Sequence, residues 1–296
     1  MLISKTDLTG AHSSRRGFSL AELVFVLALG ALVLGLVSSI GVRLQRRMLG
    51  EAARFASNDQ LSAAAELFPL DMRGLSPPAG DVAEARDTAL QIRAPLWSGV
   101  VCSASGNSLI VAAYSGAAGH AIAPAAQSGD TLWLLVDADS AESWRPLRVE
   151  SLRQISGSCP AIDASGAPVY DLSHLWSVAL RDSASVLNGV PVRLARPLRL
   201  SIYRSSDGRW YLGMRSWSTA TAQWNIVQPL AGPFAPATRG GARFQYFDLH
   251  GHLFTLGSTD PRSIARIEAL FVTDSLTPGL VAPGDSQRVV VALRNR

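Results

Sequence analysis

The feature that most constrains the fold is a long uncharged apolar segment close to the N-terminus. No charged residue occurs from Leu23 to Val42, and this length is about what a helix needs to cross a bilayer. A single carboxylate, Glu22, stands at the beginning of the apolar run. Because a lone carboxylate is costly to bury, we expect Glu22 to have a partner. The segment therefore predicts a membrane-spanning helix with one paired charge near its start.

The helical pattern continues beyond the apolar run. After Arg47, apolar residues recur at spacings that place them on one face of a helix. They are Leu49, Ala52, Ala56, Ala63 and Leu67. Pro69 is expected to end the helix, because proline interrupts the hydrogen-bond ladder and disfavours helical geometry at Phe68. We predict a helix over residues 18–70, with a length of roughly 75 Å, which suits a filament subunit better than a compact globular domain.

The remaining residues, 71–296, have the pattern of a single β-rich domain. Gly74–Gly80 is rich in Pro, Gly and Ser and predicts a loop. Short β-type runs separated by turn residues follow it. These runs are Ala89–Arg93, Ser108–Tyr114, Thr131–Val136, Leu147–Leu152 and Leu198–Arg204.

Three strand pairs stand out in this region. The clearest is a hairpin of Leu200–Arg204 and Trp210–Arg215, because Asp207-Gly208 between them supplies the positive φ of a tight turn. The other two pair Ala242–Asp248 with Leu253–Leu256, and Ile267–Thr273 with Arg288–Leu293. The expected fold class is α+β, with one long N-terminal hydrophobic helix followed by a globular domain of antiparallel strands.

Two cysteines, Cys102 and Cys159, lie far apart and have no zinc-type spacing. If the globular region lies in an oxidising compartment, we expect a disulfide between them. Two unpaired buried thiols are the alternative that the sequence leaves open.

No motif for catalysis or for a cofactor occurs in the chain, and we expect neither an enzyme nor a bound metal. His250 and His252 flank a glycine at a predicted turn, where solvent exposure is favoured over metal binding. Asp137, Asp139 and Glu142 lack the ligand spacing of a calcium loop and are expected to form a solvated turn.

The N-terminal segment resembles the start of type IV prepilins and type II secretion pseudopilins. Their pattern is a basic leader, Gly, an aromatic residue or Met, then Ser/Thr-Leu-x-Glu and an apolar stretch. It stands in this chain as Gly17, Phe18, Ser19, Leu20, Ala21 and Glu22, behind Arg15 and Arg16. An ordinary signal peptide or signal anchor is the alternative, but its apolar run does not normally contain a glutamate.

The resemblance implies a processing site and an assembly site. A prepilin peptidase would remove residues 1–17 by cutting between Gly17 and Phe18, and would methylate the new Phe18 amine. Glu22 would pair with that amine on a neighbouring subunit, while apolar residues that include Leu20 and Leu23 provide the association area. The implied partners are other pilins or pseudopilins, the prepilin peptidase, an inner-membrane assembly platform and inner-membrane lipid.

The resemblance also implies a location. The protein would lie in the bacterial inner membrane with its globular domain in the periplasm, and then in a pilus or pseudopilus. Without residues 1–17 the chain has 24 basic and 22 acidic residues. This near-neutral balance does not favour a nucleic-acid partner.

The C-terminal half resembles W-type minor pilins and J-type pseudopilins. The matching segments are Ile202-Tyr203-Arg204, Phe244–Asp248 followed by Gly251, and Ile264–Val272. From both resemblances we predict a minor pilin that primes or tips a type IV pilus. The alternatives are a J-type secretion pseudopilin and, less favoured, a membrane-anchored periplasmic binding protein or enzyme.

Overall fold

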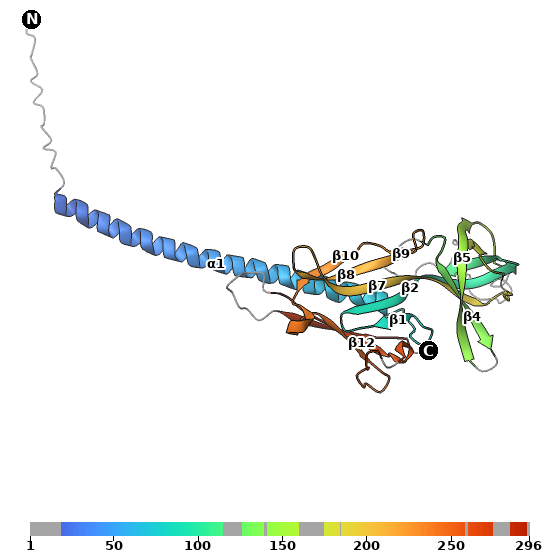
Figure 1. Ribbon diagram of the computed structural model, residues 1–296. Coiled ribbons are helices and arrows are strands. Elements are labelled where there is room, and N and C mark those ends of the chain that lie inside the picture. Colours follow the sequence, from blue (N-terminus) through green and yellow to red (C-terminus); the bar gives the residue numbers. More distant parts are fainter. Residues whose placement is uncertain are drawn as a thin grey trace, which may run out of the picture. The chain divides into compact units, whose positions relative to one another are not determined.

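A computed structural model of the chain describes residues 19–114, 126–138, 141–159, 175–183, 185–257, 260–274 and 285–294. The chain divides into two compact units, Met1–Arg54 and Phe55–Arg296. Figure 1 shows one long helix and a region built from strands. The α+β class expected from the sequence is confirmed, with antiparallel strands throughout the β-rich part.

Helix α1 spans Leu20–Met72 and contains 53 residues. Its first unit carries the apolar run, in which all residues from Ser19 to Leu49 are exposed. By length and composition, α1 is the one helix among the described residues that could cross a membrane. A helix with so many exposed apolar side chains needs lipid or other helices around it.

The end of α1 differs from the prediction that Pro69 would terminate it. The helix continues for one more turn to Met72, and the N–H of Arg73 donates to the carbonyl oxygen of Pro69 at 3.0 Å. Phe68 and Met72 are both buried in the same core. Tertiary packing on both sides of Pro69 therefore outweighs the one backbone hydrogen bond that proline removes.

The face that enters the core is not the one defined by the apolar spacing noted in the sequence. Leu61, Ala64 and Phe68, together with Met72, face the core, whereas Leu49 is exposed. The predicted positions Ala63 and Leu67 lie one residue away and are only half-buried, and Ala52 and Ala56 are exposed. Apolar residues occupy two adjacent helix faces here, and the larger side chains, Phe68 and Met72, pack in the core.

The second unit contains two antiparallel sheets. The larger has the strand order β1-β2-β3-β6-β5-β4-β7-β8-β10, with β9 paired to β8. Its strands are β1 Val82–Ala85, β2 Ala89–Ser105, β3 Ser108–Tyr114, β4 Thr131–Ala138, β5 Ala141–Ile155, β6 Leu175–Leu180, β7 Pro191–Arg204, β8 Trp210–Ser218, β9 Gln223–Trp224 and β10 Gln228–Phe234. The smaller sheet has the order β11-β12-β13. Its strands are β11 Arg243–Phe247, β12 Arg266–Val272 and β13 Ser286–Ala292, and the connections contain short 3₁₀ turns η1 Ala237–Arg239 and η2 Pro261–Ser263.

The larger sheet closes on itself, because β2 also pairs with β7. The ring β2-β3-β6-β5-β4-β7 is therefore a six-stranded barrel. Apolar side chains from all six strands fill its interior at alternate positions, as the pleat requires. They are Val101, Leu109, Val111, Leu132, Leu134, Leu147, Val149, Val178, Leu180, Val192 and Leu194.

A second core surrounds the last turns of α1, which lie between the two sheets (Figure 1). The Phe68 ring lies 5.6 Å from that of Phe244 in β11 and 6.3 Å from that of Phe271 in β12. On the other side, the N–H of Gly232 in β10 donates to Gln60 Oε1 at 3.0 Å. The C-terminal part of the helix is thus an integral part of the β-rich unit.

Two long strands connect the barrel to this helix core. Strand β2 places Leu90 and Ile92 in the helix core and Val101 in the barrel. Strand β7 runs antiparallel to it, so the first part of β7 lies in the barrel and its last part lies in the helix core. Their antiparallel ladder runs from Ala89↔Ser201 to Val100↔Pro191. The β-rich region is therefore one unit with two cores that share a pair of strands.

The strand pairs predicted from the sequence are mostly present. The β7–β8 hairpin has Gly208 at φ 80° in its turn, and β12 pairs with β13 along its length. Leu253–Leu256 is not a strand, because only a single bridge joins Leu253 to Phe247. Gly74–Gly80 is a loop that contains turns, as predicted, and Leu75 within it is fully buried.

Candidate assembly site on the N-terminal helix

Ser19 immediately precedes the helix and satisfies one of the backbone donors in its first turn. Its Oγ and its carbonyl oxygen both accept from the N–H of Glu22, at 3.2 and 3.0 Å. Ser at this position followed by Glu three residues later is the spacing of a capping box. Sequence reasoning missed this role of Ser19, although the Ser-x-x-Glu spacing could have shown it.

Glu22 lies in the first turn of α1, where the partial positive charge of the helix N-terminus favours a carboxylate. Its side chain is exposed, and within the described part of the chain it makes no ion pair. The predicted processing residues Gly17 and Phe18 lie outside the described residues. Of the predicted pair, the structure therefore describes the carboxylate alone, in the first turn of α1.

The predicted association residues are on the surface. Leu20 is 83% exposed and Leu23 is 56% exposed, and they begin the apolar surface that continues to Val42. At about 25 cal/mol per Å² of apolar area removed from water, covering such a surface is strongly favourable. This helix can therefore act as an anchor in lipid and as an association surface among similar helices.

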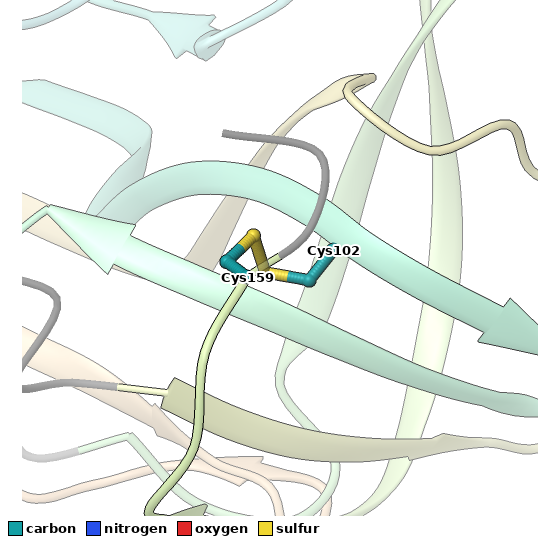
Figure 2. Close-up of a disulfide and its surroundings, with 2 residues drawn as sticks. All are labelled: Cys102 and Cys159. Carbon is teal, nitrogen blue, oxygen red and sulfur yellow. A yellow bond between two sulfur atoms is a disulfide. The ribbon is translucent and has the colours of Figure 1, made fainter. Parts of the chain in front are cut away.

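Cys102 and Cys159 form a disulfide, with their Cα atoms 5.0 Å apart. Figure 2 shows it joining β2 to the segment that follows β5. Cys102 follows the barrel-facing Val101, so it lies on the outer side of the barrel wall, where it packs with Ala112 and Leu175. Disulfides form and persist in oxidising environments.

Two buried ion pairs lie between the cores and were not predicted. Arg193 Nη1 is 2.7 Å from Asp81 Oδ2, and Arg196 Nη2 is 2.6 Å from Asp130 Oδ2. Burial raises the pKa of Asp81 above its usual range, although the positive charge of Arg193 opposes that shift. The partners lie 112 and 66 residues apart in sequence, so no local pattern could have shown these contacts. They connect the shared strand β7 to residues that precede β1 and β4.

Of the two groups of potential metal ligands, the structure describes the one around His250 and His252. Asp248 Oδ1 accepts from the N–H groups of both His250 and His252, at 2.8 Å each, and its Oδ2 lies 3.2 Å from His252 Nδ1. These contacts organise an exposed turn. Across the residues that the structure describes, no three metal-ligating side chains come together; Asp139 and the side chains of Asp137 and Glu142 lie outside that part.

The helix start, the single early carboxylate and the exposed apolar run together indicate a protein that is anchored in a membrane by its N-terminal helix. Residues 12–38 match the family model of the prokaryotic N-terminal methylation motif. This match indicates a type IV prepilin-like protein, and it implies processing by a prepilin peptidase and assembly with other pilins. No curated protein and no solved structure matches the chain.

Proposed function

We propose that this protein is a minor pilin that primes or tips a type IV pilus, and that its role is structural rather than catalytic. The observation that carries the proposal is the prepilin-type N-terminus, with its Ser19-capped helix and exposed Glu22. The chain's large β-rich unit, Phe55–Arg296, favours a low-copy subunit with its own contacts over the bulk subunit of a fibre.

The proposed orientation places this β-rich unit in the periplasm. The Cys102–Cys159 disulfide supports it, because disulfides form and persist in that oxidising compartment. The arginines do not decide the orientation, since Arg15 and Arg16 precede the apolar run and Arg46 and Arg47 follow it.

Assembly would follow from two charges that are costly to bury alone. Cleavage between Gly17 and Phe18 leaves a positive amine, and Glu22 of an incoming subunit would face the Phe18 amine of its neighbour. Each charge neutralises the other when the apolar helices come together. A buried ion pair of this kind sets axial register more than it adds stability, because its attraction is largely offset by desolvation.

The test replaces Glu22 by Ala in the full chain in its native host. The matched control is Glu51→Ala, which removes an exposed glutamate farther along the same helix. We expect Glu22→Ala to insert into the membrane normally but to be absent from sheared filaments, while the control is incorporated. Equal incorporation of both variants would refute the register argument.

The mass of the mature N-terminus tests processing separately. A chain that begins at methylated Phe18 is expected, whereas an intact Met1 would rule out the filament function. Loss of piliation upon deletion of the gene, with protein secretion unchanged, would distinguish a minor pilin from a J-type pseudopilin.

A further inference from the structure

The outward face of the larger sheet carries two arginines directly opposite each other. On β7 and β8 the residues that face the helix core alternate with outward-facing ones, and Leu200 and Met214 are among the buried set. Arg199 and Arg215 belong to the outward set and pair across the ladder. Like charges in this arrangement are destabilising, so the fold itself does not explain their presence.

The local acidic side chains do not compensate both arginines. Glu84 Oε2 lies 3.8 Å from Arg199 Nη1, but the other oxygen of the same carboxylate already binds Arg86. Arg215 is exposed, and it forms no ion pair with any residue in the described ranges. This part of the sheet therefore has an excess of positive charge that is available to a partner.

Two half-exposed tryptophans continue the same face. Trp217 is two residues beyond Arg215 on β8 and pairs with Trp224 on β9. Their ring centroids are 5.4 Å apart at an interplanar angle of 83°, an edge-to-face contact that holds both rings in place. Ile226, two residues beyond Trp224, is 87% exposed. We call Arg199, Arg215, Trp217 and Trp224 the Arg–Trp face.

Its composition is that of a protein-binding hot spot. Arginine and tryptophan dominate the binding energy of protein interfaces, where the ring supplies apolar area and the guanidinium binds carboxylates through two parallel hydrogen bonds. A nucleic-acid strand would need a longer series of cations along its backbone. The chain without residues 1–17 is nearly neutral, with 24 basic and 22 acidic residues.

We propose that the Arg–Trp face docks an acidic segment of a different prepilin-like subunit in the same filament, an inference that rests on the proposed function. Carboxylates of that segment bind Arg199 and Arg215, and an adjacent apolar side chain packs against Trp217 and Trp224. The contact gives this subunit a specific neighbour through its β-rich unit, in addition to the contacts made by its helix.

The experiment places a photo-cross-linking amino acid at Ile226 in the full chain, expressed in its native host. Adducts are identified by peptide mass spectrometry with and without Arg215→Glu. The variant puts opposite charges across the ladder from Arg199, so the fold should be at least as stable as that of the parent. Arg243→Glu, which changes an exposed arginine of the other sheet by the same charge, is the matched control.

We expect an adduct with an Asp- or Glu-rich peptide of another prepilin-like subunit. Its yield should fall about tenfold in Arg215→Glu and stay unchanged in Arg243→Glu. An equal yield in both variants, or an adduct with nucleic acid or with a peptide lacking acidic residues, would overturn the proposal.

The N-terminal mass of the protein in the same samples distinguishes a failure of the docking proposal from a failure of the proposed function. A mature Phe18 start without any subunit adduct removes only the docking proposal. An unprocessed chain without any subunit adduct removes the proposed function as well.

Discussion

Reducing the Cys102–Cys159 disulfide should destabilise the barrel by an amount that depends on the length of the loop that the disulfide closes. The two cysteines are 57 residues apart. In the chain-entropy model, opening a loop of this size restores conformational freedom to the unfolded chain and costs the folded state about 4 kcal/mol. The cost falls on the second unit, because both cysteines belong to the outer wall of the barrel.

Urea unfolding of the full chain in detergent, followed by tryptophan fluorescence, measures this effect. For a slope of about 3 kcal/mol per molar urea, reduction should lower the midpoint by about 1.3 M. A Cys102→Ala/Cys159→Ala variant is the control, because reductant should not change its midpoint. Both cysteines are almost fully buried, so its own midpoint should resemble that of the reduced parent.

An unchanged midpoint upon reduction would refute the reasoning. It would mean that the unfolded chain is already restricted between β2 and the segment after β5. If reductant lowered the midpoint of the cysteine-free variant as well, the effect would belong to the reductant and not to the crosslink.

Three further predictions concern buried side chains of the second unit. Phe68→Ala removes a ring that is 2% exposed and stacked on Phe244, so it should lower the free energy of unfolding by about 3–5 kcal/mol, measured by urea titration. Arg196→Met leaves the Asp130 carboxylate buried without its ion pair, so it should lower the free energy of unfolding by about 3–5 kcal/mol. In the double variant, the added Asp130→Leu change removes the buried charge and should restore part of this loss. Burial raises the pKa of Tyr246 in the folded state. Stability should therefore fall as the pH rises above the ordinary tyrosine pKa of about 10, and unfolding titrations should show a weaker fall for Tyr246→Phe.

The long N-terminal helix could be predicted from the sequence because its signal is local and continuous. The apolar run and the helical spacing after it require only neighbouring residues. The choice of the buried face could not be made in this way, because Leu67 and Phe68 are adjacent apolar residues. The position of Phe244 in another strand decides which of them enters the core.

The strands were found as fragments for a related reason. The predicted run Leu198–Arg204 is the second half of β7, which begins at Pro191. Arg193 and Arg196 interrupt its apolar pattern, and they are compatible with a buried strand only because Asp81 and Asp130 neutralise them from distant parts of the chain. Long-range pairing of this kind, together with the closure of the barrel, is set by the tertiary structure.

Of the candidate site, the sequence predicted the chemically distinctive part. Glu22 stands out because a carboxylate is rare in an apolar run, and the prepilin pattern places the processing site in the segment that precedes it. The Arg–Trp face could not be found from sequence. Arg199 and Arg215 become neighbours only through the register of β7 and β8.

The shared strands β2 and β7 determine how this unit responds to mechanical force. Their ladder continues from the barrel to the core around α1, with one register shift between Pro95 and Trp97. A pull that separates the barrel from the helix core along the strand direction loads β2 and β7 together, because both strands belong to both cores, and their hydrogen bonds are not opened from one end. A hairpin pulled apart from one end would lose them one at a time. Tension applied between the helix and the barrel would thus pass through this pair of strands while both cores remain folded.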